Sequence, residues 1–218
     1  MKILAVSDRV LDRLYSSDVK QKFADIDLLI GCGDLPFYFL DFLVSALDVP
    51  MVYVLGNHDQ GPQYTADGRT LTDVRGGRNI HARCVKVKGL LIAGLEGSMR
   101  YRPQAPLMYS ESEMRQQVTR LVPRLLLNRQ RYGRYLDILV SHSPPFGIHD
   151  RSDIAHTGFK ILNTFIKLFK PRYLLHGHIH VYRQDVSRVT LVENTTVINV
   201  YPYRVLDIDK PPKPFGGE

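Results

Sequence analysis

The stretch Leu28-Leu29-Ile30-Gly31-Cys32-Gly33-Asp34 contains the pattern from which the fold can be predicted. Its short apolar run has the length and composition of a strand buried on both faces, and a carboxylate follows where that strand would end. Similar runs occur at 3–6, 51–55, 136–140 and 173–175. Because helical patterns separate most of these runs, the sequence predicts an α/β layered fold.

The segments between and after these runs predict helices and further strands. Apolar spacing predicts helices at 10–23, 38–47 and 158–169, and a further helix that opens with the capping box Ser110-Glu111-Ser112-Glu113 and is kinked at Pro123. Residues 85–95 are typical of a hairpin that turns at Lys88-Gly89, and 188–208 of two or three successive strands around Glu193-Asn194. We therefore expect two mixed sheets, face to face between helices.

Length and composition restrict the class of protein. The 218 residues are 44% hydrophobic and 23% charged, enough for a full core, and no repeat or linker divides them. We expect one domain over 1–218, with 210–218 as a tail. No run approaches a membrane span, the first residues do not resemble a signal peptide, and only Cys32 and Cys84 are cysteines, so we expect a cytoplasmic protein without a membrane partner. The net charge of +7 favours acidic partners.

Polar side chains follow each predicted strand. They are Asp8, Asp34, the pair Asn57-His58, His142, and the group His176, His178 and His180. Because the carboxyl ends of strands in α/β sheets meet at one crevice, we expect these residues to form a single site. Carboxylate, amide oxygen and imidazole without thiolate suit Mn, Fe, Zn, Co or Ni.

Each of these residues also has a purely structural interpretation. An Asp at a strand end is often a turn former or helix cap, Gly56-Asn57-His58-Asp59 alone is compatible with a hairpin turn, and a single His142 with a hydrogen-bonded loop. The density of imidazole in His176-Gly-His-Ile-His180 is harder to explain without a metal. In an extended backbone His178 and His180 lie on the same face, so each can reach one of two adjacent ions.

These motifs resemble those of the calcineurin-like metallophosphoesterase superfamily. The matching segments are Ser7-Asp8, Gly33-Asp34, Gly56-Asn57-His58-Asp59, Ser141-His142 and Gly177-His178-Ile179-His180. The resemblance implies a four-layer α/β/β/α sandwich of two mixed β-sheets, and hydrolysis of phosphate monoesters or diesters with two divalent ions. It implies that Asp8, Asp34 and His180 hold the first ion, that Asp34, Asn57, His142 and His178 hold the second, and that His58 faces the scissile phosphate.

The sequence departs from the family pattern in two places. The first motif is Asp-x-His in the family but Asp8-Arg9-Val10 here, so the first ion loses one imidazole. Phe37 stands where the phosphoprotein phosphatases carry an Asp, and Asp59 replaces their Glu, which argues against a protein phosphatase. The segment from His142 to Gly147 resembles the small phosphodiesterase branches, which include cyclic-nucleotide enzymes. We therefore expect hydrolysis of a small phosphodiester, with Mn as the preferred metal.

Other polar residues are expected to surround the ligands or contact the substrate. A cluster after His142, made of His149, Asp150, Asp153 and His156, contains candidates for the missing ligand; otherwise it orders its loop or contacts substrate. Arg9 can either meet a phosphate oxygen or remain solvated. Asp59 and His176 are expected near the ligands, and His81 is expected to be non-catalytic.

Two further functions stay open. Eight arginines between 100 and 134 could follow a nucleic-acid backbone, as in a nuclease, although a solvated basic helix face is the simpler interpretation; they are Arg100, Arg102, Arg115, Arg120, Arg124, Arg129, Arg131 and Arg134. The other is a non-catalytic scaffold on a degraded metal site. A homo-oligomer is also compatible with the sequence.

Overall fold

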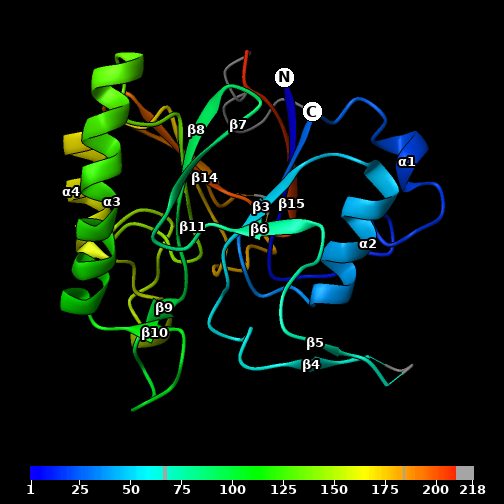
Figure 1. The fold of residues 1–218 in the computed structure, drawn as a ribbon. Helices are drawn as coiled ribbons and strands as arrows, with labels where there is room; N and C mark the ends of the chain where they lie inside the picture. Colours follow the sequence, from blue (N-terminus) through cyan, green and yellow to red (C-terminus); the bar gives the residue numbers. More distant parts are fainter. Residues whose placement is uncertain (66–67, 184, 210–218) are drawn as a thin grey trace.

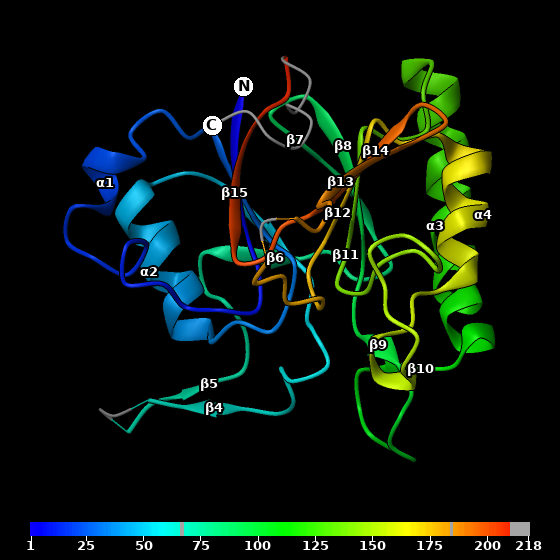
Figure 2. The same cartoon turned by 180° about the vertical axis from the view of Figure 1, so that it is seen from behind.

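The structure is a computed structural model that describes residues 1–65, 68–183 and 185–209. Two large sheets stand face to face, and each carries helices on its outer side (Figures 1 and 2). The predicted four-layer sandwich is therefore confirmed. None of the helices in the described ranges combines the length and apolar character that a membrane span requires.

The first sheet has the strand order β15-β1-β2-β3-β6. Four of its strands are parallel and β15 is antiparallel. The strands are β1 (Lys2–Val6), β2 (Leu28–Gly31), β3 (Met51–Tyr53), β6 (Gly77–Asn79) and β15 (Tyr203–Asp207). Helix α2 (Phe37–Leu47) packs on the outer face, where its Phe39, Leu40 and Leu43 join one apolar cluster with Leu4 and Leu29.

The second sheet has the order β13-β14-β12-β11-β8-β7. The central four strands are parallel, and both edge strands are antiparallel. The strands are β7 (Cys84–Val87), β8 (Leu90–Leu95), β11 (Ile138–Ser141), β12 (Tyr173–His176), β13 (Val189–Val192) and β14 (Thr195–Asn199). Helices α3 (Glu111–Tyr132) and α4 (Lys160–Phe169) cover the outer face together (Figure 2).

Residues that alternate along the strands fill the space between the two sheets. Ile3 and Ile30 of the first sheet share a buried cluster with Ile92, Val140 and Leu175 of the second. The intervening residues of the same strands point outward, toward the helices. This two-sided burial explains why the parallel strands have nearly continuous apolar sequences.

Most of the predicted elements are confirmed. Helix α3 begins with the expected capping box, in which the Ser110 side chain accepts from the Glu113 amide, and it continues unbroken through Pro123. The hairpin turns at Lys88 and Gly89, both with positive φ. Residues 188–208 form three strands, the last of which belongs to the first sheet. The predicted tail at 210–218 lies outside the described residues.

The helix predicted over 10–23 is wrong. Only α1 (Val19–Lys22) is helical there, and the preceding residues form bends and turns. The Ser16 hydroxyl donates to the carbonyl of Arg13 at 3.1 Å, which gives the backbone a local alternative to helix. The apolar spacing in this segment reflects burial rather than helix, because Leu14, Val19 and Phe23 are all buried in the cluster that includes α2.

Several short elements were not predicted from the sequence. They are β4 (Gln63–Tyr64), β5 (Thr70–Leu71), β9 (Ser98–Met99), β10 (Met108–Tyr109) and the 3-10 turn η1 (Ile154–His156). The first two form a small hairpin that projects from the body of the sandwich (Figure 1).

Candidate metal centre

The predicted site residues meet at one end of the sandwich, where β1, β2, β11 and β12 finish. A cavity of about 370 Å³ lies there. It is lined by Asp8, Asp34, Asn57, His58, Tyr101, Ala155, His156, His178 and His180. Both sheets contribute to it, so the two halves of the molecule share the site.

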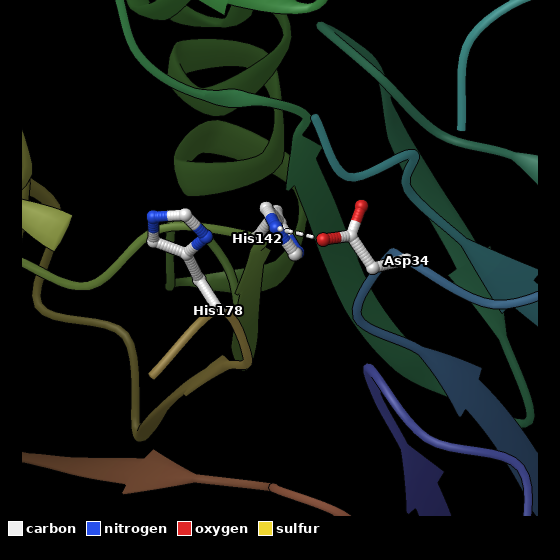
Figure 3. Close-up of side chains that lie close together, drawn as sticks. All are labelled: Asp34, His142 and His178. Atoms are coloured by element: carbon white, nitrogen blue, oxygen red, sulfur yellow. Dashed lines mark ion pairs between the residues drawn. The ribbon is translucent and has the colours of Figure 1, made fainter. Parts of the chain in front are cut away.

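The centre of the site is the group Asp34, His142 and His178 (Figure 3). Each offers one ligand atom, and these atoms all lie within 4.8 Å of one another. Asp34 follows β2, His142 follows β11, and His178 follows β12. Nε2 of His142 is 3.2 Å from Oδ2 of Asp34.

Backbone carbonyls fix which nitrogen of each imidazole faces the cavity. Nδ1 of His142 lies 2.8 Å from the carbonyl oxygen of Cys32, and Nε2 of His178 lies 2.7 Å from that of Ala155. A carbonyl can only accept, so these two nitrogens carry the hydrogens. The lone pairs of His142 Nε2 and His178 Nδ1 are therefore left for a ligand, an arrangement that metal-binding histidines commonly show.

Asn57 completes this group of donors. Its Oδ1 lies 3.1 Å from Nε2 of His142, and its Nδ2 donates to the hydroxyl of Tyr101 at 3.3 Å. The oxygens Oδ2 of Asp34 and Oδ1 of Asn57 thus face the lone pair of His142 Nε2. This arrangement is favourable only if a proton or a cation lies between these acceptor atoms. Spacings of 3.1 and 3.2 Å match the edges of about 3.0 to 3.4 Å expected for metal–ligand bonds near 2.1 Å. These residues fit a divalent ion.

The pKa values of Asp34 and His142 also favour a positive charge between their side chains. Burial opposes the charged form of Asp34, but His142 and the amide of His58 outweigh it and lower its pKa to about 2. Burial likewise opposes the imidazolium of His142, yet Asp34 raises the pKa of His142 to about 9. Burial lowers the pKa of His178 to about 4, which keeps this imidazole neutral and able to bind a metal.

Asp8 and His180 form a second group beside the first. Nε2 of His180 lies 3.4 Å from Oδ1 of Asp8. The Asp8 carboxylate also accepts from the His178 amide, at 3.1 and 3.0 Å to its two oxygens, and from the Ser7 hydroxyl. His180 stacks on Tyr201 with ring centroids 4.5 Å apart. The structure thus places the expected ligands of the first ion together, with fewer donors than the group around Asp34.

The backbone at three of the expected ligands is strained. Asp8, Asp34 and His178 have φ of 63°, 56° and 66°. Non-glycine residues seldom adopt positive φ, and where they do the strain often marks a functional site. Gly33 allows the close approach of the loops, because a Cβ there would lie 2.5 Å from Nδ1 of His142.

Val10 stands where the family pattern has a histidine. Its side chain is partly buried against the apolar cluster under α2. The neighbouring Arg9 lies beside Tyr201, whose pKa it lowers against the larger, opposite effect of burial. Arg9 is not among the residues that line the cavity.

The four candidates for the missing ligand separate in space. Only His156 lines the cavity, where its ring lies 5.3 Å from that of His178. Asp153 accepts from the amide of His156 at the start of η1, and Asp150 accepts from the amide of Gly158 at 3.0 Å. These two carboxylates order the loop.

His149 and His176 form a buried pair behind the site. Nδ1 of His149 lies 2.9 Å from Nε2 of His176, and Nε2 of His149 lies 2.9 Å from the hydroxyl of Thr190. His176 uses its remaining nitrogen on the carbonyl of Gly177. Both histidines are thus occupied by protein partners, and burial lowers the pKa of each.

Asp59 and His58 have different surroundings although they are adjacent. Asp59 is buried and accepts from the amides of Asp34 and Gly56, at 2.7 and 2.8 Å, so it holds two loops of the site together. Burial, with the nearby Asp34, raises the pKa of Asp59 to about 7. The His58 amide donates to Oδ1 of Asp34 at 2.7 Å, and the exposed imidazole of His58 borders the cavity.

Tyr101 is a site residue that sequence reasoning missed. It lies in the loop between β9 and β10 and supports Asn57 through the hydrogen bond described above. No strand end, glycine motif or histidine cluster marks it in the sequence. His81, expected to be non-catalytic, lies outside the cavity lining and bonds the amide of Glu96 at 3.1 Å.

Comparisons with known proteins agree with this geometry. The model of the calcineurin-like phosphoesterase family matches residues 1–182. The chain therefore belongs to the calcineurin-like phosphoesterase family, and a metal-dependent phosphoesterase is the class that its fold and donor set define. Curated proteins include no match to this chain.

Solved structures share the fold at low sequence identity. One aligns over 99% of this chain and 99% of its own, with a TM-score of 0.65 and 19% identity. The protein TT1561 of Thermus thermophilus aligns over 91% of this chain and 88% of its own, with a TM-score of 0.59 and 18% identity. A novel archaeal phosphodiesterase aligns over 96% and 94% at a TM-score of 0.48 and 13% identity, a likeness too weak to bear on the substrate.

Proposed function

We propose that this protein hydrolyses small phosphodiesters at a centre of two divalent ions bridged by Asp34. The observation that carries the proposal is the convergence of Asp34, Asn57 and His142, whose acceptor atoms face one another and require a positive charge between them. With His178 they would hold one ion. Asp8 and His180, together with Asp34, would hold the other, which lacks an imidazole at Val10. Mn suits this mixture of carboxylate, amide and imidazole.

The protein residues have distinct roles in the proposed reaction. When bound, divalent ions polarise the phosphoryl group and lower the pKa of water from 15.7 to about 7. The carbonyls of Cys32 and Ala155 hold the two imidazoles in the ligating tautomer, and the His58 amide orients the Asp34 carboxylate. The His58 imidazole borders the cavity and would donate a proton to the leaving oxygen.

The charge of the cavity lining supports a diester substrate. Among the described residues that line it, the basic side chains are histidines, and there is no lysine or arginine. A phosphate monoester is largely a dianion at neutral pH, whereas a diester carries a single negative charge. A lining without permanent cations leaves only bound metal to neutralise the substrate, which favours the less charged diester.

The arginine-rich segment gives little support to a nuclease. Arg100 pairs with Glu113 and Arg134 with Asp137, at 2.8 and 2.7 Å. The arginines at 115–131 belong to α3, which covers the outer face of the second sheet rather than the cavity (Figure 1). A small phosphoester is therefore the substrate class that we propose.

Parallel assays of two chromogenic substrates test this proposal. With added Mn, bis(p-nitrophenyl) phosphate should be hydrolysed at least about tenfold faster than p-nitrophenyl phosphate. Asn57→Ala should reduce diester hydrolysis by about 100-fold, as expected for a lost ligand. Asn194→Ala, the same change at an exposed turn between β13 and β14, should have no effect. A preference for the monoester would contradict the substrate class, and inactivity toward both compounds would favour the scaffold.

A further inference from the structure

A second cavity lies at the edge of the sandwich where the chain passes from β6 to β7. Its volume is about 380 Å³, and it shares no lining residue with the metal centre. It is lined by Arg78, Ala82, Arg83, Cys84, Val85, Arg120, Leu121 and Arg124. Half of this lining is arginine, so we name it the four-arginine pocket.

Three separate elements bring these arginines together. Arg78 belongs to β6, the edge strand of the first sheet, and Arg83 directly precedes β7, the edge strand of the second. Arg120 and Arg124 lie one turn apart on α3. Like charges at this spacing destabilise a helix slightly. Guanidinium groups from the edges of both sheets and from a helix are thus gathered around one cavity.

The arginines of the pocket have no carboxylate partner among the described residues. Within residues 1–65, 68–183 and 185–209, none of the four arginines forms an ion pair with a carboxylate, whereas Arg100, Arg134 and Arg183 all do. Arg120 instead bonds the neutral amide oxygen of Gln117 at 2.8 Å. Burial, with smaller contributions from Arg120 and Arg83, lowers the pKa of nearby His81 to about 4.

We propose that the four-arginine pocket binds an anion that carries two or more phosphoryl groups, of the nucleoside diphosphate or triphosphate class. A guanidinium group presents paired donors that match phosphate oxygens, and several such groups around one cavity suit consecutive phosphoryl groups. Ala82 is a partly exposed apolar residue of the lining and would contact the organic part of the ligand, whereas Val85 and Leu121 are almost fully buried. The volume lies within the range of small-molecule sites.

Binding titrations with the full-length chain test the site. Inorganic tripolyphosphate and ATP are titrated by calorimetry at low ionic strength, without added divalent ion because metal would complex the probes. Both should bind the wild-type protein. Arg120→Gln combined with Arg124→Gln should weaken binding of both probes at least tenfold and leave diester hydrolysis unchanged, because the two cavities are separate.

A matched variant distinguishes a specific pocket from general surface charge. Arg115→Gln combined with Arg131→Gln removes the same charge from exposed positions of the same helix and should leave binding unchanged. Arg83→Gln, on a different element, should weaken binding even if the double variant of α3 folds poorly. An equal loss in both double variants, or no binding of either probe to the wild type, would overturn the proposal. Tighter binding of a single-stranded oligonucleotide, weakened equally by both double variants, would replace the pocket with an extended nucleic-acid surface.

Discussion

His142 of the second sheet lies 3.2 Å from Asp34 of the first. The proposed metal centre therefore bridges the two sheets at the open end of their shared core. Any change that moves one sheet relative to the other should change the distances between ligands, and bound metal should stabilise the packing of the sheets.

Asp34→Asn should nearly abolish activity. The substitution preserves shape but removes the charge that both proposed ions share, and we expect diester hydrolysis to fall by about 100-fold or more. Metal content should fall with it, as measured by elemental analysis after dialysis against Mn. Asp73→Asn, the same change at an exposed position outside the cavity lining, should retain full activity. Normal turnover by Asp34→Asn would exclude Asp34 as the bridging ligand.

Gly177→Ala should disturb the proposed metal centre by displacing Ser7 and Asp8. A Cβ at this position would collide with the Ser7 hydroxyl and lie 2.5 Å from Oδ2 of Asp8. We expect a loss of stability of about 1 to 3 kcal/mol and weaker binding of one Mn ion. Thermal unfolding with and without Mn measures both effects. Gly89→Ala, which has open space around its Cβ, should retain normal Mn binding.

Val10→His should not restore the family's missing ligand. The Val10 side chain packs on the apolar cluster under α2, so an imidazole there would lose packing and be partly desolvated. We expect a loss of stability of about 1 kcal/mol and unchanged Mn affinity. Val10→Ala provides the control for lost packing alone. A clear gain in Mn affinity and activity would show that the loop can turn position 10 toward the cavity.

Acid should destabilise the fold through His149. Burial lowers its pKa from 6.5 to about 4, so between these values the unfolded chain binds a proton that the folded chain does not. The contribution to stability is present above pH 6.5 and is lost as the pH falls toward 4. From pH 8 to pH 5 this one group should remove about 2 kcal/mol.

Urea unfolding of the wild type and His149→Gln at these two pH values measures the effect. The variant should be less stable than the wild type at pH 8, because it loses the bonds to His176 and Thr190, and should lose less stability on acidification. Identical pH dependence in both proteins would contradict the assignment to His149.

The sequence predicted the sheets well because they depend on strands that are buried on two faces, and it predicted that polar side chains at the ends of these strands meet at one cavity. Runs such as residues 28–30 have few alternative structures, and the end of each run marks where a ligand can reach the crevice. The helix expected over 10–23 failed because side-chain bonds of Ser16 favour turns, which helical spacing alone does not reveal. Tyr101 and the pairing of His149 with His176 depend on loops whose positions arise only in the folded chain.

The antiparallel pairing of β15 with β1 has a consequence for shortening the chain. Every proposed metal ligand precedes residue 182, where the family match ends. Removing the residues from Tyr203 onward would nevertheless expose the main-chain groups of β1 on one side and loosen the strand that carries Asp8. A truncated chain that contains every proposed ligand should therefore aggregate, or bind the proposed ion at Asp8 and His180 more weakly.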